Sequence, residues 1–232
     1  MTPLVLIPGY MLDDGLWDAM LPHLPSELPL HFASLSEGDS IAAMAQAVLA
    51  RCPEKFTLLG FSMGGYVARE IVRLAPQRVQ ALALVATSSR ADNPVIAEQR
   101  AKAARANPIG AYRGLGRAAI QQSLSPDNAA NEALVAQVRL MGERLGRDVF
   151  IRQSLIVRQA DTAQLGRITC PVLVVHGADD QLRSLDEAQE LAQGIPGAQL
   201  QMLPHCGHLI PLEQPQALAQ LLANWLAAHA AA

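Results

Sequence analysis

KFTLLGFSMGGYVAREIVRLAP, residues 55–76, indicates the fold of this 232-residue chain more clearly than any other stretch. The apolar run FTLL, which begins at Phe56, predicts a strand. The letters GFSMG follow and fit the pattern G-x-S-x-G, with Ser62 at the centre. Apolar residues then recur at helical spacing until Pro76 ends the pattern: Val67, Ala68, Ile71, Val72, Leu74 and Ala75. The stretch therefore predicts a strand, a sharp turn and a helix.

The turn at Ser62 leaves little room for side chains. A strand that passes directly into a helix crowds the residues on both sides of the corner, so Gly60 and Gly64 supply space and permissive dihedral angles. Such a corner exposes the hydroxyl of Ser62, and the N–H of Met63 at the helix N-terminus faces an anion that forms beside it. A tight turn with an incidental serine has the same pattern, so its meaning depends on the rest of the chain.

Further apolar runs predict strands on either side of this unit. They span residues 4–7 and 30–35 before it, and 79–86, 171–177 and 200–203 after it. Helical patterns alternate with them at 13–24, 40–51, 184–193 and 213–229. This succession predicts an α/β fold with a mostly parallel six-stranded sheet and helices on both faces. Ligands of such sheets bind beyond the carboxyl ends of the strands.

The segment 90–168 interrupts this alternation. A structureless loop of that length is improbable in a compact domain. Helical patterns cover 95–106, 109–124, 129–145 and 149–157, the second of them broken by glycines, and a short helix at 161–168 returns to the core. We therefore expect a core formed by residues 1–89 and 169–232, with 90–168 inserted as a helical cap in a single structural unit.

Charge is distributed unevenly between this insertion and the rest of the chain. Residues 90–168 hold 12 Lys and Arg against 7 Asp and Glu, whereas the remainder holds 6 basic and 14 acidic residues. The simplest interpretation is a solvated helical surface. The alternative is a cap that attracts an anionic substrate, such as a carboxylate or an acyl thioester of a phosphorylated carrier.

Composition narrows the class of protein. Half of the residues are hydrophobic and 17% are charged, which suits one soluble domain with a large core. The formal charge of −3 gives no reason to expect a nucleic acid or an anionic membrane as partner. No apolar run approaches the roughly 20 residues of a membrane span, and the N-terminal residues lack the features of a signal peptide, so we expect a cytoplasmic location. The cysteines and histidines lack the spacing of a disulfide framework or a metal site.

The unit around Ser62 resembles the nucleophile elbow of the α/β-hydrolase superfamily, in which a serine, an acid and a histidine follow in that order. HGADD at 176–180 is similar to the superfamily's H-G-x-x-D segment. That similarity implies Asp180 as the acid, with the neighbouring Asp179 as second choice. GH at 207–208, followed by EQP at 213–215, is similar to the segment that supplies the histidine, and it implies His208 as the base.

The resemblance also implies an oxyanion hole made by the backbone N–H groups of Met63 and Tyr10. The superfamily usually has His-Gly after the first strand, whereas this chain has Pro8-Gly9. Proline lacks an N–H, but the expected donor lies two residues later, so the hole can still form. Either Tyr10 or Met11 then points inward. The expected lining of an apolar substrate pocket is Tyr10, Met11, Trp17, Met63 and residues of the cap.

Other residues with suitable chemistry fit structural roles better. His205 and His176 lie close to the ends of predicted strands, where a structural imidazole is expected. Cys206 stands beside the expected base and not at an elbow, so it is expected to be a small buried residue. One more departure from the superfamily concerns the segment after Asp180, which often contains Val-Pro and here contains Arg183-Ser184.

These residues imply a serine hydrolase that cleaves small-to-medium carboxylic esters through an acyl-Ser62 intermediate, without a cofactor or a metal. The expected partner is a small ester substrate, neutral or anionic. The resemblance leaves open two alternatives, a hydrolase of thioesters or carbon–carbon bonds and a slow-turnover ligand sensor that signals through its cap. Oligomeric state also stays open.

Overall fold

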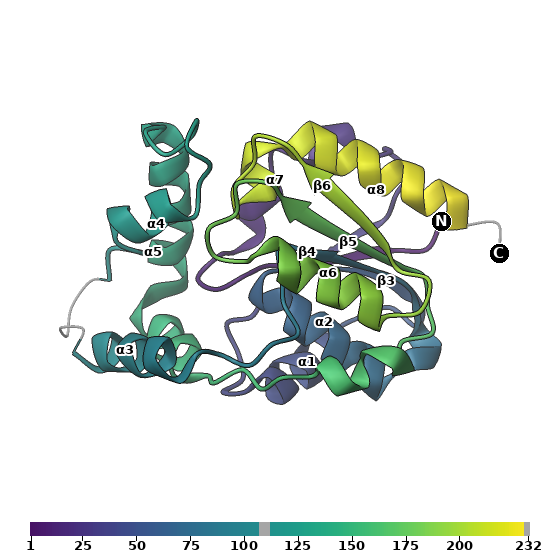
Figure 1. Ribbon diagram of the computed structural model, residues 1–232, viewed down its shortest axis with the longest axis horizontal. Coiled ribbons are helices and arrows are strands. Elements are labelled where there is room, and N and C mark those ends of the chain that lie inside the picture. Colours follow the sequence, from purple (N-terminus) through teal and green to yellow (C-terminus); the bar gives the residue numbers. More distant parts are fainter. Residues whose placement is uncertain (107–111, 230–232) are drawn as a thin grey trace.

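A computed structural model describes residues 1–106 and 112–229 and contains one six-stranded sheet, in which all strands are parallel (Figure 1). The strand order is β2-β1-β3-β4-β5-β6. The strands are β1 Leu4–Ile7, β2 Leu30–Phe32, β3 Phe56–Phe61, β4 Val79–Val85, β5 Val172–Gly177 and β6 Gln199–Leu203. The chain runs outward from β1 to β2 and then returns to the other side of β1. Ligands of such sheets bind at the carboxyl ends of the strands where the order reverses, which here is the end of β1 and β3.

Helices cover both faces of the sheet, because alternate strand residues point to opposite sides. Val5 and Ile7 pack in a cluster with residues of α1 Ile41–Leu49, α2 Met63–Leu74 and α6 Leu185–Gly194. Leu4 and Leu6 pack on the other face with residues of α8 Pro215–His229. Two short helices complete the core fold: η3 Pro76–Arg78 and α7 Ile210–Glu213.

The region between β1 and β2 differs from the expected helix at 13–24. It contains two short 3-10 helices, η1 Asp14–Leu16 and η2 Leu21–His23. Gly15 favours a turn, and Pro22 lacks the N–H that a longer helix requires, so no continuous helix forms. The apolar residues still reach the core, where Leu16 and Trp17 are fully buried.

The chain between β4 and β5 contains α3 Pro94–Arg105, α4 Arg117–Gln122, α5 Glu132–Leu155 and η4 Thr162–Arg167. In Figure 1, α3, α4 and α5 lie beyond one end of the sheet. The patterns expected at 129–145 and 149–157 form two helical stretches, which share the label α5 and are separated by a break at Gly146, where φ is 80°. Of the pattern at 109–124, residues 109–111 lie outside the described residues, and only Arg117–Gln122 forms a helix in the described part.

The end of this insertion is anchored to α2 by buried charges. Arg69, with no exposed surface, donates to the Asp161 carboxylate over 2.7 and 3.0 Å and to the Ser88 carbonyl over 2.7 Å. Arg73 adds a second ion pair to Asp161 at 2.8 Å. The helix that follows the Ser62 turn is therefore tied to the segment by which the insertion returns to the sheet. Within residues 1–106 and 112–229, no helix combines the length and the apolar character that crossing a bilayer requires.

Candidate active site

Ser62 occupies the corner between β3 and α2 with φ 51° and ψ −113°, a conformation that residues other than glycine rarely adopt. Close packing enforces this corner, since a Cβ atom at Gly60 would lie 2.6 Å from the carbonyl oxygen of Gly64. Thr87, two residues beyond the end of β4, supports it by donating from its hydroxyl to the Ser62 carbonyl over 2.7 Å. No motif in the sequence indicates this role of Thr87, because the contact depends on the pairing of β3 with β4.

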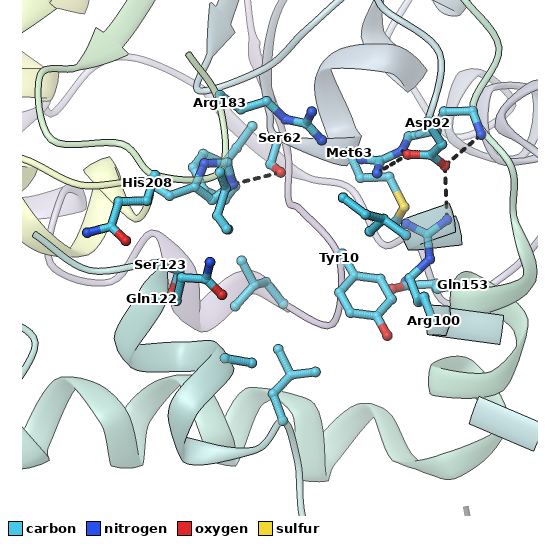
Figure 2. A pocket seen from close by; sticks show the side chains of 18 of the residues that line it. Tyr10, Ser62, Met63, Asp92, Arg100, Gln122, Ser123, Gln153, Arg183 and His208 are labelled. Carbon is cyan, nitrogen blue, oxygen red and sulfur yellow. Dashed lines mark hydrogen bonds and ion pairs between the residues drawn. The ribbon is translucent and has the colours of Figure 1, made fainter. Parts of the chain in front are cut away.

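A continuous line of hydrogen bonds joins Ser62, His208 and Asp180. Nε2 of His208 lies 2.9 Å from Oγ of Ser62, and Nδ1 lies 2.8 Å from Oδ2 of Asp180. Figure 2 shows the first of these contacts. The structure therefore brings together the three side chains that the sequence singled out, although they follow three different strands. The partner of the imidazole is Asp180 and not Asp179.

Backbone groups hold Asp180 as an ionised acceptor. Its second oxygen, Oδ1, accepts hydrogen bonds from the N–H groups of Leu182 and Arg183 over 2.8 and 2.9 Å. Burial alone would raise the pKa of Asp180, but the interaction with His208 and these backbone bonds outweigh it, so the pKa lies below its usual range. The carboxylate is thus suited to orient an imidazole and to stabilise its positive charge.

The loop that carries His208 is fixed by Glu213. One oxygen of this carboxylate accepts from the N–H of Gly207 over 3.0 Å, and the other accepts from Ser125 N–H over 2.7 Å and from Asn128 over 3.1 Å. The backbone N–H of His208 itself bonds to the Ser123 carbonyl over 2.9 Å. The insertion therefore helps to position the imidazole. The sequence contained a signal for this in EQP at 213–215, which indicated only the start of the final helix.

The other candidate residues take different positions. His176 is buried, and burial lowers the pKa of its imidazole. Cys206 is buried too, and burial raises the pKa of its thiol. His205, expected to be structural, is instead 80% exposed, with its nearest carboxylate on Asp127 at 3.8 Å. It follows β6 in a positive-φ turn that directs its side chain to solvent.

In the turn after β1, Tyr10 lines the cavity and Met11 is buried away from it. The N–H of Met11 donates to Oε1 of Gln153 over 2.8 Å, and Nε2 of Gln153 donates to the Leu35 carbonyl over 2.9 Å. Tyr10 extends toward α5, where its hydroxyl lies 2.6 Å from that of Ser154. Gln153 thus connects the insertion to the loops after β1 and β2. Sequence reasoning missed Gln153, because nothing in the local sequence of α5 distinguishes it from a surface glutamine.

A cavity of about 870 Å³ opens beside Ser62 and His208 (Figure 2). Tyr10 and Met63 line it. Met11 and Trp17 do not, which corrects the expectation that they would: both are fully buried, and Trp17 packs in the core beneath the sheet. The apolar side chains of the lining come from both the core and the insertion: Leu12, Phe61, Leu115, Ala119, Val138, Ile156 and Leu209.

Charged side chains lie on the opposite side of Ser62 from His208 in Figure 2, where Asp92 and Arg100 are seen together. Asp92 accepts from Arg100 over 2.9 Å and is also paired with Arg158. Burial alone would raise the pKa of Asp92, but the two guanidinium groups lower it to about 2. Within the part of the chain that the structure describes, no group of three or more His, Cys, Asp or Glu side chains is arranged to hold a metal ion.

Known proteins that resemble this chain are hydrolases. Residues 35–215 match the family model described as serine aminopeptidase, S33. A pimeloyl-[acyl-carrier protein] methyl ester esterase from Nitrosomonas europaea is 30% identical over 232 residues, covering 92% of this chain and 91% of that protein. A second esterase of that name, from Aromatoleum aromaticum, is 29% identical over 254 residues, covering 94% of this chain and 96% of that protein.

Solved structures share the fold over almost the whole chain. A thermophilic esterase from Thermogutta terrifontis has a TM-score of 0.83 at 26% identity, with 99% of this chain and 90% of that chain covered. An enol-lactonase from Burkholderia xenovorans has a TM-score of 0.84 at 20% identity, with coverages of 98% and 92%, and it shows the fold alone. This chain belongs to the serine aminopeptidase S33 family of α/β hydrolases and is an enzyme that acts on ester bonds.

Proposed function

We propose that this enzyme is a serine hydrolase that cleaves small-to-medium carboxylic esters through an acyl intermediate on Ser62. The observation that carries the proposal is the line of hydrogen bonds from Ser62 through His208 to Asp180, with contacts of 2.9 and 2.8 Å. A serine hydroxyl is a weak nucleophile at neutral pH, and this arrangement supplies both a base and a group that orients the base.

In the proposed mechanism, Nε2 of His208 takes the proton from Ser62 as Oγ attacks the ester carbonyl. Asp180 accepts a hydrogen bond from the N–H at Nδ1 of His208, which fixes the tautomer of the ring. It also stabilises the imidazolium that forms. The imidazolium then protonates the departing alcohol. A water molecule, activated by the same nitrogen, attacks the acyl-enzyme and releases the acid.

The backbone N–H groups of Met63 and Tyr10 are proposed to bind the oxyanion. Met63 begins α2, where the N–H groups of the first turn have no partner within the helix. Tyr10 is preferred to Met11, because the Met11 N–H is already bonded to Gln153. One such donor contributes about 3 kcal/mol to the stability of the transition state.

The names of the relatives suggest a first substrate to test, the methyl ester of pimeloyl-[acyl-carrier protein]. The apolar lining of the cavity suits an unbranched acyl chain, since burial of each methylene contributes about 0.8 kcal/mol. Helices α3 to α5 are proposed to form the cap that covers this chain.

The test is an assay of purified protein on p-nitrophenyl esters of increasing acyl length, beside Ser62→Ala. We expect turnover of roughly 1 per second or faster on at least one ester, and loss of that turnover in the variant. The dependence on chain length then measures the depth of the cavity. Equal inactivity of both proteins on every ester would exclude a simple esterase and would favour a carbon–carbon hydrolase or a slow-turnover sensor.

A further inference from the structure

Four arginines and two carboxylates line the cavity, and three of the arginines are fully engaged by protein groups. Arg90 makes a two-point contact with Glu190 outside the cavity. Arg158 pairs with Asp92 through its guanidinium and its backbone N–H. Arg100 donates to Asp92 over 2.9 Å and to the carbonyls of Ser154 and Ile156 over 3.1 and 2.7 Å. These three side chains have structural partners that account for their positions.

Arg183 differs from the other three arginines. Its guanidinium makes one hydrogen bond in the described part of the chain, from Nη1 to Oε1 of Glu187 at 3.2 Å. Nε is buried and has no partner among the described residues. The second oxygen of Glu187 is occupied by the N–H and hydroxyl of Ser184, in the cap of α6. Glu187 therefore offers Arg183 a single-point contact, where a guanidinium can engage a carboxylate at two points.

Arg183 places its positive charge in the cavity that Ser62 and His208 also line. It follows Asp180 by three residues, and its own N–H donates to the Asp180 carboxylate over 2.9 Å. In Figure 2 its guanidinium extends past Ser62 toward the side where Asp92 lies. The side chain is 19% exposed, and it belongs to the cavity lining. The α/β-hydrolase superfamily often has valine-proline in this segment, so the cation is a departure made by this chain.

We propose that Arg183 binds an anionic oxygen group of the substrate, so that the enzyme prefers esters that carry a carboxylate over neutral esters of the same length. The inference rests on the proposed ester hydrolysis at Ser62 and adds a substrate class to it. A charge-assisted hydrogen bond from the guanidinium to a carboxylate is about twice as strong as a neutral one.

The experiment compares two methyl esters of one chain length, monomethyl pimelate and methyl heptanoate, on wild type and on Arg183→Gln. We expect KM for the half-ester to rise about tenfold in the variant, with kcat within a factor of two and methyl heptanoate little affected. Arg183→Lys keeps the positive charge but lacks the planar set of donors of a guanidinium, so it should recover part of the affinity. Arg51→Gln removes an equal charge from an exposed surface pair and should leave both substrates unchanged.

Two kinetic results for Arg183→Gln on the two methyl esters would overturn the proposal. A variant that loses activity equally on both esters would show that Arg183 only supports the Asp180 loop, and a variant that loses none would show that the side chain contacts no substrate. The methyl pimeloyl thioesters of pantetheine and phosphopantetheine identify the source of the anion. A preference for the phosphorylated thioester that Arg183→Gln abolishes would assign the contact to phosphate and would overturn the carboxylate class.

Binding separates this inference from the proposed hydrolysis. Monomethyl pimelate is titrated calorimetrically into Ser62→Ala and into Ser62→Ala/Arg183→Gln, neither of which needs to turn over. We expect the second protein to bind about tenfold more weakly. Equal affinities would overturn the role of Arg183 even if the ester assay succeeds, whereas inactive wild type with unequal affinities would overturn the hydrolysis alone.

Discussion

At the scale of single residues, the site depends on side chains that are each held by several contacts. Asp180 illustrates this, because one oxygen contacts His208 and the other accepts two backbone N–H groups. The neighbouring Asp179 has the same chemistry and no contact with the imidazole. The pair therefore offers a matched comparison of two adjacent carboxylates.

Asp180→Asn should reduce kcat/KM by about 10⁴-fold, because an amide no longer holds the productive tautomer of His208 or stabilises its charge. Asp179→Asn, the control, should retain activity close to wild type. Steady-state kinetics on one p-nitrophenyl ester measures both. The opposite ranking of the two variants would assign the acid to Asp179.

The lowered pKa of Asp180 predicts that the contribution of its carboxylate to stability is lost in acid. The ionised carboxylate stabilises the fold above the ordinary pKa of 3.8, and this contribution is lost as the pH falls through the lower pKa of the folded state. The difference in melting temperature between wild type and Asp180→Asn should therefore be constant near neutral pH and shrink in acid. A difference that grows in acid would contradict the lowered pKa.

At the scale of elements, the insertion makes hydrogen bonds that hold loops of the site. Gln153 of α5 bonds to the Met11 N–H, and Glu213 bonds to the segment between α4 and α5. Both contacts position loops that carry proposed catalytic groups. Removal of either should therefore affect the rate of reaction more than the binding of substrate.

Gln153→Leu should lower kcat by roughly 10- to 100-fold with a smaller change in KM, because the turn at Tyr10 loses its anchor and small displacements in a catalytic site are costly. Gln153→Glu retains an acceptor for Met11 and should recover part of kcat. Gln137→Leu, in the part of α5 before Gly146 and with a contact of 3.4 Å to Gly15, serves as the control and should not change kcat. If Gln153→Leu lowered stability but left kcat unaltered, Gln153 would contribute to the fold alone and would not position the turn at Tyr10.

The elements that the sequence predicted best are those with a single strong signal. Four of the strand patterns are reproduced to within one residue, and the FTLL strand continues two residues further, to Phe61. The runs of β1, β3, β4 and β5 are clear in the sequence because these strands are buried on both faces of the sheet. The second strand ends at Phe32, three residues early, because it lies at the sheet edge and its residues are only partly buried. The prediction of one helix at residues 13–24 was wrong. The spacing of the apolar residues favoured a helix, but Gly15 and Pro22 prevent a continuous one.

Motifs singled out Ser62, Asp180 and His208, the three side chains that hydrogen bonds join in the structure, because each stands in a turn with its own local pattern. The sequence did not indicate the roles of Thr87, Gln153 and Glu213, because no local pattern around them indicates these roles. Their importance lies in contacts with segments from 6 to 142 residues away in the chain. Such contacts exist only in the folded arrangement, so local sequence cannot indicate them.

At the scale of the whole molecule, the buried cluster around Asp161 joins the insertion, the end of β4 and α2. Asp161→Asn should reduce the free energy of unfolding by about 3–5 kcal/mol, because Arg69 would remain charged with no exposed surface and no ionic partner of equal strength. Urea unfolding measures the change. Glu37→Gln, which breaks an exposed pair with Arg51, should change it by less than about 1 kcal/mol.

The insertion between β4 and β5 also has a consequence for the order of folding. Leu82 pairs with Val172 across the whole inserted segment, so this pairing closes a long loop and carries a large entropic barrier. Ser62 precedes the loop, whereas Asp180 and His208 follow it. Hydrolytic activity therefore cannot appear during refolding before these two halves of the chain have joined, and its recovery with time reports the latest long-range step in the formation of the sheet.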